Sequence, residues 1–149
     1  MADPKPQPVF RVQKLYLKDL SFENPQAPNS FFQHEEPKVE VKLSVANRQL
    51  DAEHWEVTLS VTATAPAADQ TLFIVEAEHA GLFHLKGIPE GQLPAVLGVD
   101  CPTLIFPFTR QVLSQATLDG GFMPLLLEPI NFAAMYESGR RAEAEQQKH

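Results

Sequence analysis

The central part of the chain alternates apolar and polar residues with a period of two. From Lys38 to Val45 every odd position is apolar and every even position is polar, and the stretch Trp55 to Thr62 repeats this pattern. Such alternation is typical of strands that bury one face and leave the other in water, which favours an antiparallel sheet. The short connection from Asn47 to Glu53 predicts a hairpin between the two strands.

A longer and less regular strand is predicted from about Val9 to Glu23. Its apolar positions change parity twice, first between Val12 and Leu15 and again between Leu17 and Leu20. A one-residue slip turns every following side chain to the other face of a sheet. The two changes therefore predict bulges or twists within one long strand.

A fourth strand is predicted from Gln70 to about Lys86. Its first part, Leu72 to Val75, is apolar at both parities, whereas Glu76, Glu78 and His84 share the even side. A strand that is apolar on both faces must be covered on both. This indicates a subunit interface or a bound ligand.

The pattern after the strands is helical. Asp100 is expected to cap a helix that has Pro102 in its first turn, where the missing donor costs little. Apolar residues then follow helical spacing from Leu104 to Ala116, and the helix should end before Gly120. Pro107 lies inside this pattern and should delay the start of the helix or kink it.

A final short helix is predicted to begin at Asn131, with Phe132, Met135 and Tyr136 on one side. Four strands followed by helices predict an α+β fold and not the alternation of a nucleotide-binding fold. The chain has 149 residues, which suits one domain. We expect a disordered arm over residues 1–8, a folded domain over 9–138 and a polar, flexible tail over 139–149.

Charge and composition exclude several classes of function. The net charge is −7, and the 12 Lys and Arg residues are scattered along the chain. This argues against nucleic-acid binding and against an anionic membrane surface, and favours a basic protein partner. The start of the chain has no apolar segment typical of a signal peptide, and no apolar run is long enough to span a bilayer. With its single cysteine, Cys101, the chain is expected to be cytoplasmic.

Motifs of catalysis and of metal binding are absent from the sequence. There is no phosphate-binding glycine pattern and no G-x-S-x-G nucleophile elbow. Cys101 stands at a predicted helix start, where a thiol can be activated, but a lone cysteine is more often simply packed. His79 and His84 are five apart and point to opposite faces of a regular strand, so we predict no metal site. His34 and His54 have no neighbouring cysteine cluster.

Two carboxylates two residues apart, Glu76 and Glu78, allow three interpretations. They are a solvated sheet surface, an acid–base pair if desolvation separates their pKa values, or part of an acidic docking patch. Asp19, Glu23 and the pair 35–36 add to the acidic charge, but the sequence does not fix whether these residues converge.

Phenylalanine occurs ten times, and several copies stand beside prolines or in predicted loops. The pair 31–32, the stretch 106–108 and Phe122 are of this kind. Core packing is the default interpretation of any one of them. Together with Met123 and Met135 they would suit an adaptable apolar groove.

Four strings in this order and spacing resemble the SecB family of protein-export chaperones. They are FRVQKLYLKDLSFE (Phe10 to Glu23), FIVEAEHAGLF (Phe73 to Phe83), CPTLIFPFTR (Cys101 to Arg110) and LLLEPINFAAMY (Leu125 to Tyr136). The resemblance runs from about Phe10 to Tyr136. It implies a four-stranded antiparallel sheet with helices packed on one face, assembled as a tetramer, a dimer of dimers. It further implies a cytoplasmic chaperone that binds unfolded precursor proteins, passes them to the translocation ATPase SecA, and is neither an enzyme nor dependent on a cofactor.

The resemblance also implies two sites. An acidic surface for SecA would consist of Asp19, Glu23 and Glu76, with Ile74 as an apolar contact. A groove for clients would contain Phe22, Phe73, Phe106, Phe108, Phe132, Met135 and Tyr136. The chain departs from the family pattern at Val75, where some relatives have cysteine, and at Phe108, where some have tyrosine. The second change makes the groove drier.

Two other functions are compatible with the residues. In the first, the chain is an oligomeric adaptor whose apolar surface is entirely subunit interface. In the second, it is an enzyme that uses Glu76 and Glu78. Binding of an unfolded peptide distinguishes the chaperone from the adaptor, and a pH-dependent activity lost in Glu78→Gln would indicate the enzyme.

Overall fold

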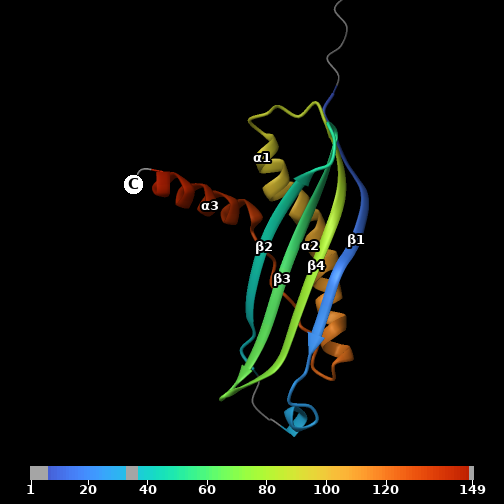
Figure 1. Ribbon diagram of the computed structural model, residues 1–149, viewed down its shortest axis with the longest axis vertical. Helices are drawn as coiled ribbons and strands as arrows, with labels where there is room; N and C mark the ends of the chain where they lie inside the picture. The colour runs from blue at the N-terminus through green and yellow to red at the C-terminus, as the bar shows by residue number, and fades with distance from the viewer. Residues whose placement is uncertain (1–6, 33–36, 148–149) are drawn as a thin grey trace, which may run out of the picture.

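A computed structural model describes residues 7–32 and 37–147 and shows one antiparallel sheet with helices on one side (Figure 1). The strands are β1 (Val9–Glu23), β2 (Glu40–Gln49), β3 (His54–Ala67) and β4 (Gln70–Lys86), in the order β1-β4-β3-β2. The remaining elements are η1 (Asn29–Phe32), α1 (Leu93–Ala95), η2 (Val96–Asp100), α2 (Cys101–Asp119) and α3 (Phe132–Gln147). The α+β class and the four predicted strands are confirmed.

The two parity changes in β1 are bulges. The pairing of β1 with β4 shifts between Val12 and Lys14 and again between Leu17 and Asp19. Residues opposite each other in a ladder point to the same face, so each shift restores the apolar side chains to the helix side. All six apolar side chains of the predicted pattern therefore share one face: Phe10, Val12, Leu15, Leu17, Leu20 and Phe22.

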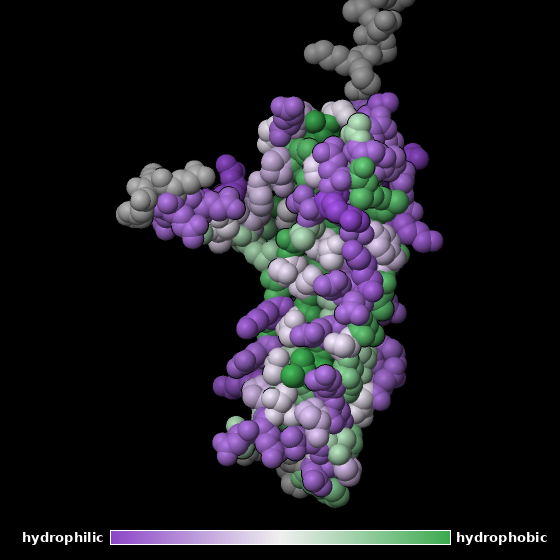
Figure 2. Space-filling model, viewed as in Figure 1, coloured by the Kyte–Doolittle hydropathy of each residue, from purple (hydrophilic) through white to green (hydrophobic). Residues whose placement is uncertain are grey.

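The sheet has one covered face and one open face. Odd positions of β3 and β4, such as Val57, Leu59, Val75 and Phe83, are fully buried and pack with α2 residues such as Ile105. The even positions form the open face, which Figure 2 views directly and along which hydrophilic side chains are spread. This alternation confirms the predicted wet face of the antiparallel sheet.

The apolar start of β4 has a local explanation. Pairing of β3 with β4 shifts at Ala65 and Pro66, because Phe73 pairs with Ala65 but Thr71 pairs with Pro66. The extra residue, Leu72, is 5% exposed and belongs to the core. In the stretch from Leu72 to Val75, Ile74 is therefore the one apolar side chain on the open face.

The prediction that Asp100 caps a helix is wrong. Asp100 has helical backbone angles and makes no capping hydrogen bond, because helical structure has already begun at Leu93. A π-helical turn, η2, joins α1 to α2, and the Cys101 N–H donates to the carbonyl of Val96. Pro102 has no N–H to donate to Gly98, which favours such a widened turn.

Pro107 lies within α2 and does not delay its start. It removes the donor that would reach the carbonyl of Thr103, four residues earlier. Both residues are exposed, so water can replace the lost hydrogen bond. The helix ends before Gly120, as predicted.

The last helix, α3, begins after Asn131, as the sequence predicts. The Asn131 side-chain oxygen accepts a hydrogen bond from the Ala134 N–H at 3.0 Å, which is an N-cap. Beyond Tyr136 the side chains are exposed as far as Gln146, and α3 extends away from the sheet (Figure 1). The helix thus occupies most of the predicted tail, and the flexibility of 139–149 stays a prediction.

Most of the predicted arm, residues 1–6, lies outside the described residues, and Gln7 and Pro8 are exposed without regular structure. The boundaries of the three predicted segments stay predictions. Over residues 7–32 and 37–147, no helix is long and apolar enough to cross a bilayer.

Candidate functional site

Four phenylalanines form a cluster beside the C-terminal end of α2. The rings of Phe73 and Phe122 are 4.8 Å apart, and Phe22 stacks on Phe73 at 5.9 Å. Phe31 joins from η1, with its ring 5.5 Å from that of Phe122. Because Phe31 is 49% exposed while Phe73 is 3% exposed, this aromatic cluster runs from the core to the surface.

The cluster is held in place by glycines and by a polar contact. A Cβ on Gly120 would overlap the ring of Phe22, and one on Gly121, whose φ is +91°, would meet Phe31 at 2.7 Å. Asn24 donates from its amide to the carbonyl of Gly120 at 3.3 Å. These contacts fix the end of β1 and the chain after it against the end of α2.

An extended linker, residues 122–131, leads from the aromatic cluster back along α2. The Leu125 N–H donates to the Thr117 hydroxyl at 2.8 Å, and Arg110 Nε donates to the Leu127 carbonyl at 2.9 Å. A cleft of about 440 Å³ lies beside the linker. It is lined by Val39, Val41, Leu125, Leu126, Leu127, Glu128, Pro129 and Ile130.

A second aromatic pair lies at the other end of this linker. Phe106 and Phe132 meet edge to face at 5.9 Å, and both are buried. Tyr136 packs on Gly98, where a Cβ would be 2.9 Å from its ring. Gly120 comes fourteen positions after Phe106, which corresponds to about 21 Å along a helix.

The structure divides the seven predicted groove residues into three parts. Phe22 and Phe73 belong to the aromatic cluster, and a second group gathers at the start of α3. The second group consists of Phe106, Phe132, Met135 and Tyr136. Phe108 stands apart, because it is 47% exposed on the side of α2 turned away from the sheet.

Phe31 and Phe122 were predicted, from their loop positions, to suit an apolar groove, but the groove implied by the SecB resemblance does not include them. Their neighbours follow no helical or strand period, so nothing local indicates which way the rings point. Only the ends of α2 and β1 bring them together. The apolar cleft along the linker was not predicted.

The predicted acidic surface lies on the open face. Asp19 pairs with Glu78, Ser21 with Glu76, and Glu23 with Ile74 in the β1–β4 ladder. Glu76 is therefore diagonal to both Asp19 and Glu23, at a typical spacing of about 7–8 Å. Strand order and register, which could not be deduced from the sequence, place all four predicted residues together.

No carboxylate of this acidic patch, which we define as Asp19, Glu23, Glu76 and Glu78, forms an ion pair within 7–32 and 37–147. Like charges close together on an exposed surface produce a negative potential that attracts a basic partner. The pair 35–36, also considered for this patch, lies outside the described residues.

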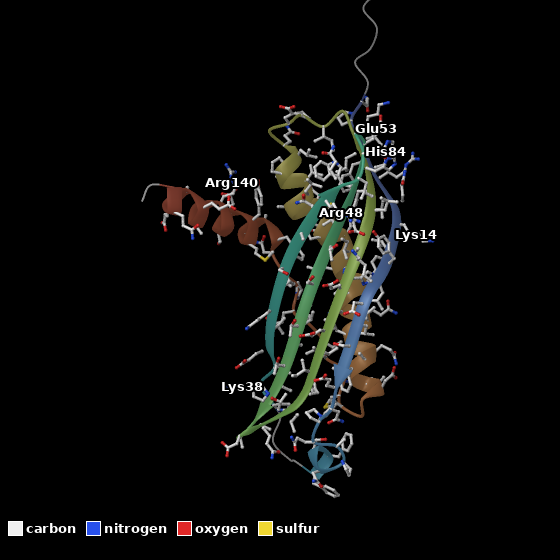
Figure 3. The ribbon with its side chains drawn as sticks, viewed as in Figure 1. Lys14, Lys38, Arg48, Glu53, His84 and Arg140 are labelled. Atoms are coloured by element: carbon white, nitrogen blue, oxygen red, sulfur yellow. The ribbon has the colours of Figure 1, made fainter. Side chains whose placement is uncertain are left out.

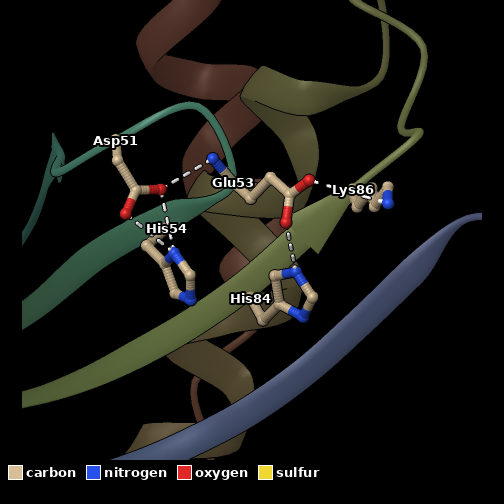
Figure 4. Close-up of polar contacts among 5 residues, drawn as sticks. All are labelled: Asp51, Glu53, His54, His84 and Lys86. Atoms are coloured by element: carbon tan, nitrogen blue, oxygen red, sulfur yellow. Dashed lines mark hydrogen bonds and ion pairs between the residues drawn. The ribbon is translucent and has the colours of Figure 1, made fainter.

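The three histidines of the described residues, His54, His79 and His84, are not arranged to hold a metal ion. His79 lies on the helix side, where desolvation lowers its pKa, and His84 lies on the open face. His84 Nε2 donates to Glu53 at 2.9 Å, and His54 donates to Asp51 at 2.8 Å (Figure 4). In the part of the chain that the structure describes, no three His, Cys, Asp or Glu residues are placed to hold a metal ion.

The remaining candidate nucleophile is inert. Cys101 is fully buried, and this burial, together with the nearby charge of Asp100, raises the pKa of its thiol to about 12. A thiol in that state is not a nucleophile at neutral pH. His34 and His149 lie outside the described residues.

Comparison with known proteins decides the family. Residues 3–143 match the family model described as preprotein translocase subunit SecB. The chain belongs to the SecB family. A protein-export protein SecB from Desulfotalea psychrophila is 53% identical, over 93% of this chain and 91% of the relative. The corresponding SecB protein of Magnetococcus marinus is 47% identical, over 94% of this chain and 90% of the relative.

The SecB fold is also found in a solved structure of a SecB-like chaperone from Mycobacterium tuberculosis, in complex with a ChAD peptide from the HigA1 antitoxin. The TM-score is 0.69 at 18% identity, and the match covers 81% of this chain and 90% of the other. At this identity the likeness concerns the fold. It confirms the sheet with helices on one face that the SecB resemblance implied.

Proposed function

We propose that this SecB-family chain is an ATP-independent chaperone that holds unfolded precursor proteins for export. The observation that carries the proposal is the aromatic cluster, which continues from the core to an exposed ring at Phe31 and lies at the start of the linker whose later residues line an apolar cleft. The M. tuberculosis relative, whose structure contains a bound peptide, gives further support.

Such a groove selects unfolded chains by burial alone. Apolar burial is non-directional and contributes about 25 cal/mol per Å², so many client sequences can satisfy it. Folded proteins have already buried the side chains that would enter. Ordering an extended client costs about 1–2 kcal/mol per residue for the backbone, so tight binding needs a long contact or several grooves.

We infer a tetramer from apolar side chains that one chain leaves exposed. Phe10, Leu17 and Leu20 are each about 40% exposed on the helix side of β1, an edge strand. Leu104, Phe108 and Leu118 are exposed along one side of α2, opposite the sheet. Contiguous apolar surfaces of this kind mark protein interfaces. Edge pairing through β1 and packing on the outer side of α2 would give two distinct interfaces, as a dimer of dimers requires.

The acidic patch is the proposed docking surface for SecA in the cytoplasm. Its carboxylates are unpaired within the described residues, and Ile74 supplies an adjoining apolar contact. The patch lies on the open face, whereas the groove lies on the helix side. A client and SecA can therefore be bound at the same time, which suits transfer from one to the other.

Calorimetry with an unfolded secretory precursor, without nucleotide, tests the function. Phe31→Ala removes an exposed ring and should weaken binding about fivefold, since an aromatic contact contributes about 1 kcal/mol. Leu50→Ala is the matched control, because Leu50 is 47% exposed on the distant β2–β3 turn. If the wild-type tetramer does not bind the precursor, its apolar surface serves only assembly and the proposal fails.

A further inference from the structure

Opposite charges predominate at the two ends of the open face along the direction of the strands, although Lys42 lies in the row of Glu76. The acidic patch occupies the half around the pairs Asp19–Glu78 and Glu23–Ile74. The other half carries a basic strip, which we define as Arg11, Lys14, Lys18, Arg48 and Lys86. A row of uncharged side chains at Tyr16, Ala80 and Thr58 lies between the two halves, and Lys18, from the bulge beside Asp19, reaches back across it to Glu56.

Two cations of the basic strip, Lys18 and Arg48, are held by one buried carboxylate. Glu56 is 8% exposed, although it points to the open face. It accepts a hydrogen bond from the Tyr16 hydroxyl at 2.6 Å, and Lys18 and Arg48 approach its other oxygen at 3.1 and 3.6 Å. The hydrogen bond from Tyr16 is the largest cause of a lowered pKa at Glu56. Glu56 thereby holds cations from β1 and β2 over the middle of the sheet.

The cations keep donors for another carboxylate. Arg48 is 69% exposed and Lys18 is 37% exposed, so each still presents N–H groups to solvent. Arg11 and Lys14 are exposed and make no ion pair within residues 7–32 and 37–147. Lys14 extends outward from β1 in Figure 3, where Arg48 stands over the middle of the sheet.

We propose that the basic strip binds an acidic surface of the same partner whose basic surface binds the acidic patch. This inference rests on the proposed function, in which that partner is SecA. Leu82, which pairs with Lys14, comes six positions after Glu76 along β4, so the two charged regions are about 20 Å apart. A partner that carries a basic and an acidic surface at that spacing can bind in only one direction along the strands. A partner with a single basic segment could bind in either direction.

Isothermal calorimetry with SecA tests the strip with charge reversals. Arg11→Glu combined with Lys14→Glu should weaken binding about tenfold at low salt, and the loss should shrink at higher ionic strength because exposed charges are screened. Arg140→Glu combined with Arg141→Glu on α3 changes the net charge equally but lies off the sheet (Figure 3). This control should bind SecA within about twofold of wild type.

The outcomes separate this inference from the function on which it rests. If Glu76→Lys weakens SecA binding but the strip variant binds no worse than the α3 control, the strip proposal is wrong and the acidic docking surface stands. If neither variant affects SecA binding, the docking surface itself is wrong. Association of wild-type tetramers with one another at low salt, lost in the strip variant, would show that the strip binds a second copy of this protein and would also overturn the proposal.

Discussion

The ring of Phe22 lies over Gly120, on the side of the backbone where any other residue would carry its Cβ. Phe22 is fixed in turn by Phe73 and Phe122, whose rings lie 5.9 and 6.3 Å away. A glycine at the end of α2 therefore sets how closely β1 and the aromatic cluster approach. The contact between Phe22 and Gly120 therefore links the packing of β1 on α2 to the shape of the proposed groove.

Gly120→Ala should disturb the groove more than the fold. The added methyl group must displace Phe22, at a cost of about 1–3 kcal/mol in the free energy of unfolding. Moving Phe22 also loosens the cluster, so peptide affinity measured by fluorescence anisotropy should fall about fivefold. Gly91→Ala is the control, because nothing lies within 4 Å of the added group. If the peptide affinity of Gly120→Ala is unchanged, the aromatic cluster does not take part in client binding.

Glu76→Lys should weaken the binding of SecA and leave peptide binding unchanged. The substitution places a cation diagonal to Asp19 and Glu23, on the face of the sheet opposite the groove. Surface plasmon resonance with SecA, together with peptide titration, measures both effects. Glu90→Lys makes the same change of charge at an exposed position outside the sheet. Equal loss of both activities in Glu76→Lys would indicate misfolding and not a docking surface.

The pair Tyr16–Glu56 should stabilise the fold in a pH-dependent way. Hydrogen bonding from Tyr16, and then from Lys18, lowers the pKa of Glu56 below its usual 4.5. A lowered folded-state pKa gives stability that is present above about pH 4.5 and is lost as the pH falls through the folded value. Urea unfolding should show Glu56→Gln less stable than wild type at pH 7, with the difference shrinking below pH 4.5.

A double-mutant cycle isolates this contact. Burial and the hydrogen bond to Glu56 raise the pKa of Tyr16 to about 12, so Tyr16 stays a donor at neutral pH. Tyr16→Phe should cost about 1.5–3 kcal/mol at pH 7, as expected for a hydrogen bond to a charged group. The same substitution should cost clearly less in the Glu56→Gln background. Additive effects would show that the two residues act independently.

Leu20→Glu should reduce the size of the assembly. Leu20 is 40% exposed on the helix side of the edge strand β1, where the proposed interface would bury the new carboxylate. Light scattering should show dimers or monomers in place of a tetramer, with unchanged circular dichroism. Leu50→Glu, at an exposed turn, should keep the wild-type mass. A tetrameric Leu20→Glu would remove β1 from the proposed interface.

The sequence was most informative about the strands, where the odd or even position of a residue determines the face of the sheet to which it points. The parity changes near Lys14 and Lys18 became two bulges, and the odd positions of β3 and β4 became the core. β1 and β4 have the predicted bounds, whereas β2 and β3 continue several residues beyond the predicted ends at Val45 and Thr62, because pairing with neighbours adds positions that alternation alone does not mark. The helical start was missed, since the π turn before Cys101 depends on Pro102 and on packing against Tyr136 and not on a cap.

Only part of the candidate site could be predicted from patterns in the sequence. The acidic residues came from a family resemblance, and only the pairing of β1 with β4 brings Asp19, Glu23 and Glu76 together. The buried Glu56 reads in the sequence as one more polar position of an alternating strand. Its three partners come from β1 and β2, which no local pattern connects.

The most direct test of the chaperone function is the aggregation of a denatured secretory precursor diluted into buffer without ATP. With an equal amount of this protein present as assembled tetramer, light scattering should rise more slowly and the precursor should remain in complex with the chaperone. Phe31→Ala should protect less well than Leu50→Ala, because only Phe31 belongs to the aromatic cluster. Aggregation at the rate seen without the protein would contradict the account.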